Sequence, residues 1–481
     1  MSSVHVTGPA EAATVRREDA RLARGVLSNV DIATSTMANI APAMSFFFGF
    51  GLIASTAGVP APLTIIAAAV AIALLGNTLT QFSRVHPSTG SFVTFIGRAF
   101  GPYAAVTMAI VLGVGYIVAV SSVVAISGAW SQTILRHYLH IHIPWQPITL
   151  VLTLTALAMI IRGAKVSTKA AAVFFGFELG LLLVIAVALL IKHSSSLNLH
   201  PFDPGRLAGG FSGLSLGFPL AVYMFLGWEN SAALAEESQD PRVGIGKAIF
   251  WSLLLLGATY ILLAYTTVIA YGENIKSLSN ASVPYVDAAH GVASFLAFLA
   301  YIAGFTSIFG TLLSAANSQA RIIFNSGREG LLPRWVGSVT AHSRTPWAAF
   351  LVFLGLALGL TYVFGWNTPP LVFFGEIGTM GTILVIVTYL VANLALPVYY
   401  RRYHIEKFHP FTHLILPLLG AAAVGYPLYE LVKPGQPSPF DQYRWIALGV
   451  VVVALVWAAV VVVRDRTLGE RVGSIVADAE H

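Results

Sequence analysis

Long apolar runs separated by short polar segments dominate the chain. Between Asp31 and Arg84 there is no Asp, Glu, Lys or Arg, which is enough for two membrane-spanning helices of about 20 residues joined by a turn at 57–62. The same alternation continues downstream and predicts an all-α integral membrane protein with twelve spans. We place them at 28–57, 63–83, 103–135, 147–161, 168–191, 211–235, 245–271, 295–324, 347–364, 371–399, 412–432 and 445–463.

Composition supports lipid as the solvent of this chain. Of its 481 residues, 56% are hydrophobic and only 10% are charged, and no soluble domain can bury that much apolar surface. The net charge of +6 does not indicate nucleic acid binding, because the basic residues are spread over separate loop edges. The absence of cysteine excludes disulfides and thiolate sites.

The distribution of Lys and Arg predicts the orientation of the spans. Most of the 27 basic residues fall in segments that an inside amino terminus places in the cytoplasm, and only these fall outside: Arg136, Lys192, Arg206, Lys276, Lys433 and Arg444. We therefore expect a multi-pass protein of the plasma (inner) membrane with both termini cytoplasmic. Its expected parts are an N-terminal tail (1–27), a ten-helix core (28–400), two further helices (401–463) and a C-terminal tail (464–481).

Two of the predicted spans carry a break near the middle of the membrane. Pro42 lies halfway along the first span, where a proline costs about 3 kcal/mol in a helix interior. Gly227 lies at a similar depth in the sixth span, which runs in the opposite direction. A simple proline kink is the alternative for the first break alone. Together, the breaks predict two five-helix inverted repeats with a solute site at mid-membrane.

The chemistry of the two breaks predicts the kind of solute. Free amides near Ala43 and the positive end of the helix dipole suit a carboxylate. Exposed carbonyl oxygens at 223–226 suit an ammonium group, so a zwitterion fits both ends.

Three motifs relate the chain to a known family. They are FLGWE at 225–229 with AEESQDP at 235–241, SQAR at 318–321 with REGLLP at 328–333, and GSF at 90–92. With them the chain resembles the amino acid, polyamine and organocation permease superfamily, whose fold is shared with the sodium-coupled leucine transporters. The resemblance implies a secondary active transporter for an amino acid or related amine that works by alternating access, and not an enzyme.

The same resemblance implies a set of substrate-binding positions. The family's glycine-rich break in the first span is replaced here by IAPAM at 40–44. Tyr223 stands where the family has an aromatic lid over the substrate. Together with the carbonyl end of the sixth span and Tyr116, which could reach the site from the third span, the candidate substrate-binding residues are Ile40, Ala41, Ala43, Met44, Ser45, Tyr116, Tyr223, Phe225 and Leu226.

Acidic residues inside the spans are candidates for ion coupling. Glu178 falls where proton-coupled members carry a lysine in the fifth helix, and desolvation there would favour a protonated carboxyl group. Glu229 is a second intramembrane carboxyl group, which we expect to take part in proton coupling. A sodium ligand or a buried structural hydrogen bond is the alternative for Glu178. Thr311 and Ser314 form a possible cation site, although hydroxyls in membrane helices mostly bond their own backbone.

A gate is expected at the inner end of the sixth span. Glu236 and Glu237, with Tyr223 above them, form the predicted gate, and we expect basic residues such as Arg84 and Arg98 to be partners of the two carboxylates. The alternative is a solvated acidic loop edge.

Several functional alternatives remain open on the sequence. They are an ion-independent amino acid or amine exchanger, a polyamine permease, and a solute receptor or channel. We expect no cofactor and no metal site, a proton gradient or else sodium as the driving force, and a monomer or homodimer. The partners expected are a small amino acid or amine and the lipid bilayer.

Overall fold

The regular structure of the chain is helical. The computed structural model describes residues 22–341 and 343–472, and apart from one pair of extended residues, Leu27 and Ser238, its elements are helices. The prediction of an all-α membrane protein is confirmed. The long helices are α2 (Asn29–Ile40), α3 (Pro42–Ala57), α4 (Ala61–Val85), α6 (Pro102–Tyr138), α7 (Trp145–Ile161), α8 (Ala164–Lys192), α9 (Phe211–Tyr223), α11 (Gly244–Ala270), α14 (Ser294–Glu329), α15 (Trp347–Gly365), α16 (Pro370–Tyr403), α17 (Leu416–Val432) and α18 (Phe440–Arg464).

Short helices fill the connections between them. Apolar stretches of this length are too short to be recognised as separate elements in the sequence, and we did not expect them there. They are α5 (Ser91–Phe100), α10 (Asn230–Ala233), α12 (Ile275–Asn280), α13 (Pro284–Val292) and α19 (Leu468–Arg471), the 3-10 turns η1 (Ser194–Ser196), η2 (His200–Phe202), η3 (Pro204–Arg206), η4 (Ala235–Glu237), η5 (Arg334–Gly337) and η6 (Ile405–Lys407), and the π-helical turn η7 (Phe411–Ile415).

Membrane-spanning length is reached by ten helical stretches in the described part of the chain, counting α2 with α3 and η7 with α17. The other two predicted crossings correspond to α7, which has 17 residues, and to α9 with its interrupted continuation. The count of twelve and the inverted repeat therefore stay predictions. Large apolar side chains such as Val173, Phe250 and Val453 are exposed on the outside of the bundle, where lipid would cover them.

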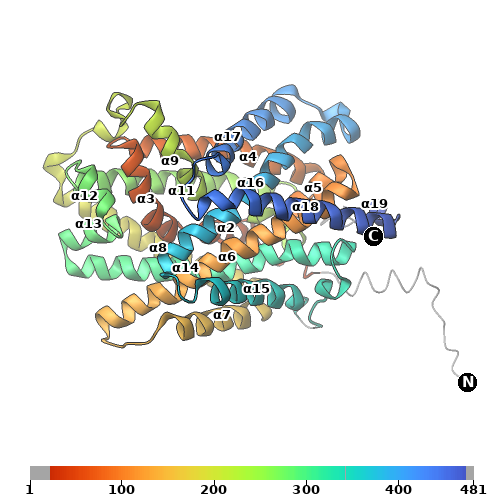
Figure 1. The fold of residues 1–481 in the computed structure, drawn as a ribbon, viewed down its shortest axis with the longest axis horizontal. Coiled ribbons are helices and arrows are strands. Elements are labelled where there is room, and N and C mark those ends of the chain that lie inside the picture. The colour runs from red at the N-terminus through yellow and green to blue at the C-terminus, as the bar shows by residue number, and fades with distance from the viewer. Residues whose placement is uncertain (1–21, 342, 473–481) are drawn as a thin grey trace, which may run out of the picture.

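The long helices lie side by side in one bundle (Figure 1). Helix α6 is central and packs against α14, α15 and α16. The two interrupted helices meet in register, since α3 packs against α9 and α2 packs against α10. Helices α17 and α18 lie against α4, α6 and α16. The two breaks lie next to one another within this bundle, since Asn39 donates to Gly227 O.

The described chain begins and ends at the same end of the bundle. The Leu27 amide donates to Glu237 O at 2.8 Å, and Gln239 donates back to Leu27 O at 3.0 Å. Near the other terminus, Arg471 Nε donates to Glu329 O at 3.3 Å. This arrangement agrees with an even number of crossings. Residues 1–21 and 473–481 of the predicted tails lie outside the described residues, and the side of the membrane on which the tails lie stays a prediction.

An ionic cluster holds the loop after α8 at the opposite end of the bundle. Glu273 accepts hydrogen bonds from Asn198 at 2.8 Å and from His200 Nδ1 at 2.9 Å. Arg206 Nη1 lies 3.6 Å from the same carboxylate. The cluster fastens residues 198–206 to the turn that follows α11.

Candidate solute site between two interrupted helices

The first span is broken at one residue. Helix α2 ends at Ile40 and α3 begins at Pro42, while Ala41 between them has φ 55° and ψ 69°, in the left-handed region. Pro42 is the first residue of α3, a position where the missing N–H would have no helical partner anyway. The Ser45 hydroxyl donates to Ile40 O at 2.7 Å and so covers one carbonyl left open by the break. The predicted interruption is confirmed, and a simple kink is excluded.

The second break is a stretch of turns between α9 and α10. Gly227 there has φ 100°, and a Cβ atom at this position would lie 2.0 Å from Asn39 Nδ2. That amide donates to Gly227 O at 3.2 Å. A side chain at position 227 would thus be strained and would clash, and glycine lets the two breaks touch directly.

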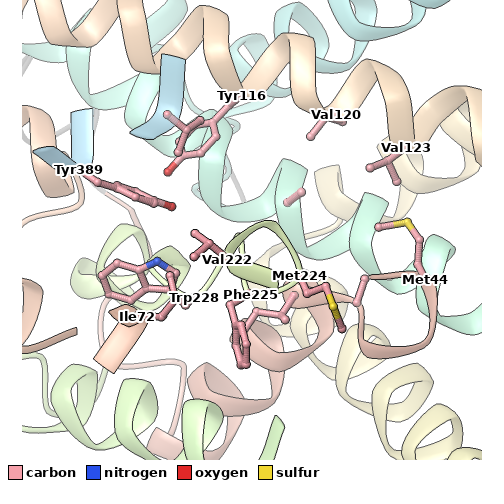
Figure 2. Packing of buried hydrophobic residues seen from close by; sticks show 14 of the residues in the cluster. Met44, Ile72, Tyr116, Val120, Val123, Val222, Met224, Phe225, Trp228 and Tyr389 are labelled. Atoms are coloured by element: carbon pink, nitrogen blue, oxygen red, sulfur yellow. The ribbon is translucent and has the colours of Figure 1, made fainter. Parts of the chain in front are cut away.

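A small cavity of about 50 Å³ lies between the breaks. Figure 2 shows Met44 from the first break and Val120 and Val123 from α6 on one side of this region. The cavity is lined by Asn39, Ile40, Met44, Ser45, Ala119, Val120, Val123, Tyr223, Leu226, Gly227, Thr311, Ala315 and Gln319.

A larger cavity of about 520 Å³ lies beyond it, toward the end of the bundle that carries α12 and α13. Its walls come from α3, α9, α16 and the segments 279–284 and 431–440. Ser45 and Tyr223 line both cavities. The Tyr223 ring stands edge to face with Phe374, with 6.5 Å between the ring centroids. Tyr223 therefore has the position expected of a lid, and its function as a gate stays a prediction.

The predicted substrate-binding residues divide into two groups. Those that line the small cavity are Ile40, Met44, Ser45, Tyr223 and Leu226. The others lie at or near the breaks without lining it. Ala41 and Ala43 form the turn itself, and Phe225 packs against Tyr260 with 5.1 Å between ring centroids.

Tyr116 and Glu229 bond to each other instead of facing the cavity. The Tyr116 hydroxyl donates to Glu229 Oε1 at 2.6 Å, and the Gly227 amide donates to Glu229 Oε2 at 3.1 Å. Figure 2 shows the hydroxyl ends of Tyr116 and Tyr389 pointing toward one another beside Trp228. Glu229 is 1% exposed. Its carboxylate thus holds the second break in shape.

Glu178 reaches the first break from α8. Its Oε1 accepts the Ala43 amide at 2.6 Å, and the next amide, that of Met44, donates to Ser307 Oγ at 3.1 Å. The amides that the sequence suggested for a solute carboxylate are therefore bonded to protein groups in this conformation. A carboxylate at a helix N-terminus is also favoured by the helix dipole.

The hydroxyl groups of the candidate cation site bond to the first half of the first span, α2. Thr311 donates to Ala38 O at 3.1 Å. The Ser314 hydroxyl donates to Ser35 O, and its oxygen lies 2.9 Å from Ser35 Oγ. These bonds tie α14 to α2 and bring two hydroxyl oxygens close to two backbone carbonyl oxygens, and a role of this group in binding a cation stays a prediction.

The expected partners of the inner acidic pair were wrong. Glu237 forms an ion pair with Arg321, and Glu236 forms one with Arg328. Both carboxylates are buried, so they are not a solvated loop edge. The turn η4, which carries both carboxylates, lies beside the C-terminal part of α14, so the arginines of α14 are within bonding distance of them. By contrast, Arg84 donates to Gln81 and Arg98 lies over the Tyr403 ring at 5.1 Å.

Sequence reasoning could have found the arginines of α14. Arg321 and Arg328 are seven residues apart, which puts them on one face of a helix, and both lie in quoted motifs. Asn39 and Gln319, which line the small cavity, were also missed. Their signal was a side-chain amide within a predicted membrane span.

The fold of this chain resembles that of a solved membrane protein. A solved structure of a manganese transporter variant from Eremococcus coleocola matches 93% of this chain and 99% of its own, with a TM-score of 0.56 and 11% identity. At that identity the likeness concerns the fold alone. Interrupted helices that meet at a central cavity are the arrangement typical of secondary transporters.

The amino acid permease family model matches residues 27–464, and the chain belongs to this family. Among the relatives, the branched-chain amino acid permease of Bacillus subtilis is 23% identical and covers 84% of this chain and 86% of its own. The methylthioribose transporter of the same organism is 24% identical, and the match covers 95% of this chain and 98% of that protein. Cationic amino acid transporter 4 of Mus musculus is 26% identical, and the match covers 67% of this chain and 52% of that protein. These relatives are transporters, and the chain is a multi-pass membrane transporter and not an enzyme.

Proposed function

We propose that this protein is a secondary active transporter that binds an amino acid or related amine between the two breaks and moves it inward by alternating access, driven by protons. The observation that carries the proposal is the pair of interrupted helices with a cavity between them. The solute ammonium group meets the carbonyl end of α9 near Leu226. The solute carboxylate meets the amide end of α3.

Proton coupling in this proposal depends on Glu178. Its bond to the Ala43 amide is a charge-assisted one while the carboxyl group is ionised, and such bonds are roughly twice as strong as neutral ones. Protonation weakens this bond and releases the amide for the carboxylate of the solute. Proton binding and solute binding are thereby linked at one helix end.

Sodium is the less favoured coupling ion in this proposal. The oxygens around Thr311 and Ser314 are hydroxyls and α2 carbonyls, and none of them carries a negative charge for the ion. The proposal also places the protein in the plasma membrane with both termini in the cytoplasm, as the distribution of Lys and Arg indicates.

Two closures make the cycle alternate. Tyr223, which lines both the small cavity and the larger one, is the outer closure in this proposal. The ion pairs of Glu236 and Glu237 with α14 hold the other side closed. Opening of the second requires both buried pairs to separate or to move together with α14.

Transport is tested with purified protein in proteoliposomes. Labelled amino acids and amines are supplied while the pH gradient and the sodium gradient are varied separately. We expect accumulation that follows the pH gradient and not the sodium gradient. Strong counterflow that ignores both gradients would instead indicate an exchanger, and binding without accumulation would indicate a receptor.

The coupling role of Glu178 is tested with Glu178→Gln, which keeps the shape and removes the titration. Glu406→Gln is the matched control, since Glu406 lies in the exposed turn η6. We expect the first variant to lose the pH dependence of uptake and the second to keep it. A Glu178→Gln protein whose uptake responds to pH as steeply as the parent would remove this residue from the mechanism.

A further inference from the structure

The residues that line the small cavity include two side-chain amides with unused hydrogen-bonding capacity. Asn39 Oδ1 and Gln319 Oε1 are buried, and neither accepts a hydrogen bond from the described part of the chain. Both residues are 5% exposed and both line the cavity. Buried polar groups in native proteins are nearly always paired, so water or a bound solute in the cavity would supply the missing partner.

The two amides differ in how firmly they are held. Asn39 is fixed across the breaks by its bond to Gly227 O. Gln319 makes no side-chain hydrogen bond to the described residues, so its amide can turn and present either the oxygen or the NH₂ group to a ligand. The pair thus offers acceptors for an ammonium or hydroxyl group and donors for a carboxylate.

The walls of the small cavity carry no charge. Its lining consists of apolar side chains, glycine, hydroxyls and the two amides. The two buried carboxylates at the breaks are engaged elsewhere, Glu178 with the Ala43 amide and Glu229 with Tyr116 and the Gly227 amide. A solute with a net charge would therefore be desolvated here without a counter-ion, which is strongly unfavourable.

We propose that the small cavity selects a solute without net charge, a zwitterion with a short uncharged side chain being the best fit, and that Asn39 and Gln319 hold its polar groups. The small volume, about 50 Å³, favours a short side chain over a long cationic one. This inference rests on the proposed function because it concerns the same site, and it excludes the cationic and polyamine substrates that the family resemblance left open.

Equilibrium dialysis of the purified full-length protein tests the selection by charge. The labelled probes are alanine, serine, lysine, glutamate and putrescine at pH 7. We expect alanine or serine to bind at least tenfold more tightly than each of the three charged probes. Equal or tighter binding of a charged probe overturns the inference, and no binding of any probe overturns it together with the proposed function.

Two substitutions of Gln319 test the role of its amide. Gln319→Met keeps the size and removes the amide, and we expect binding of the preferred probe to weaken at least tenfold without a fall in the melting temperature. Gln319→Glu adds a carboxyl group, and we expect the preference to shift toward lysine and putrescine. Unchanged affinity and unchanged preference in both variants would show that Gln319 does not contact the solute.

Thr153→Val is the control for removing an unpaired buried polar group. The Thr153 hydroxyl on α7 is buried without a hydrogen-bond partner in the described chain, and it does not line either cavity. We expect the Thr153→Val protein to bind each probe with the affinity of the parent. A tenfold loss of affinity in this variant would contradict the assignment of the Gln319 effect to the cavity. Uptake into vesicles is measured separately: selective binding without accumulation rejects transport but supports selection by charge.

Discussion

Arg321 is the residue whose removal should most clearly separate stability from gating. Its side chain is fully buried, and it donates to Glu237 and to Asn317 Oδ1, the latter at 2.8 Å. The change to test is Arg321→Met, because methionine is also a long unbranched side chain but carries no charge. This variant leaves Glu237 buried without its counter-ion.

The magnitude follows from the burial of both partners. The side chains of Arg321 and Glu237 are 0% and 3% exposed, and removing one member of such a pair costs about 3–5 kcal/mol because the other charge is left uncompensated. Replacing both members by apolar residues is often nearly neutral. We therefore expect Arg321→Met with Glu237→Leu to be at least about 2 kcal/mol more stable than Arg321→Met alone.

Two measurements check this expectation. Unfolding in mixed micelles gives the free energy of unfolding for the parent, the single variant and the double variant. Because the chain has no cysteine, Ser238→Cys beside the pair gives a single thiol for an impermeant maleimide. We expect faster labelling in the Arg321→Met background as the inner closure loosens.

The reasoning fails under two results. A free energy of unfolding for Arg321→Met within about 0.5 kcal/mol of the parent would mean that the buried pair is not energetically important. A double variant as unstable as the single one would mean that the uncompensated carboxylate is not the cause of the loss.

Three further predictions concern the breaks and the outer loop. Gly227→Ala should lower the free energy of unfolding by at least about 2 kcal/mol, through its left-handed backbone and the clash at Cβ, and should abolish uptake; normal uptake would contradict this. Tyr116→Phe should cost about 1.5–3 kcal/mol in chemical unfolding, because it removes a hydrogen bond to a buried carboxylate, that of Glu229. Partial burial raises the pKa of Glu273, but hydrogen bonds and charges from residues 198–206 outweigh it and hold the pKa below its usual range. The ionised carboxylate therefore stabilises the fold above the usual pKa of a glutamate, and this stabilisation is lost as the pH falls through the lowered pKa. The free energy of unfolding, measured from pH 6 to pH 3, should fall with decreasing pH in the parent by an amount that is absent in Glu273→Gln.

The amino-acid sequence was enough to determine the class of protein and the position of both breaks. Apolar runs without charges can be stable only in lipid, and this depends on composition alone. The interruptions at Pro42 and Gly227 were also predictable, because each follows from the local backbone chemistry of one residue. The short helices at the ends of the bundle were not, since their apolar patterns are too brief.

The tertiary structure alone decided which side chains meet. Glu178 bonds to the amide of Ala43, which is 135 residues away, and Glu229 turns to Tyr116 and not to the cavity. Arg321, and not Arg84 of α4 or Arg98 of α5, pairs with Glu237. A helix turns by about 100° per residue, so the direction of each side chain depends on how its helix is rotated against its neighbours. That rotation is set by packing over the whole bundle, which local sequence does not specify.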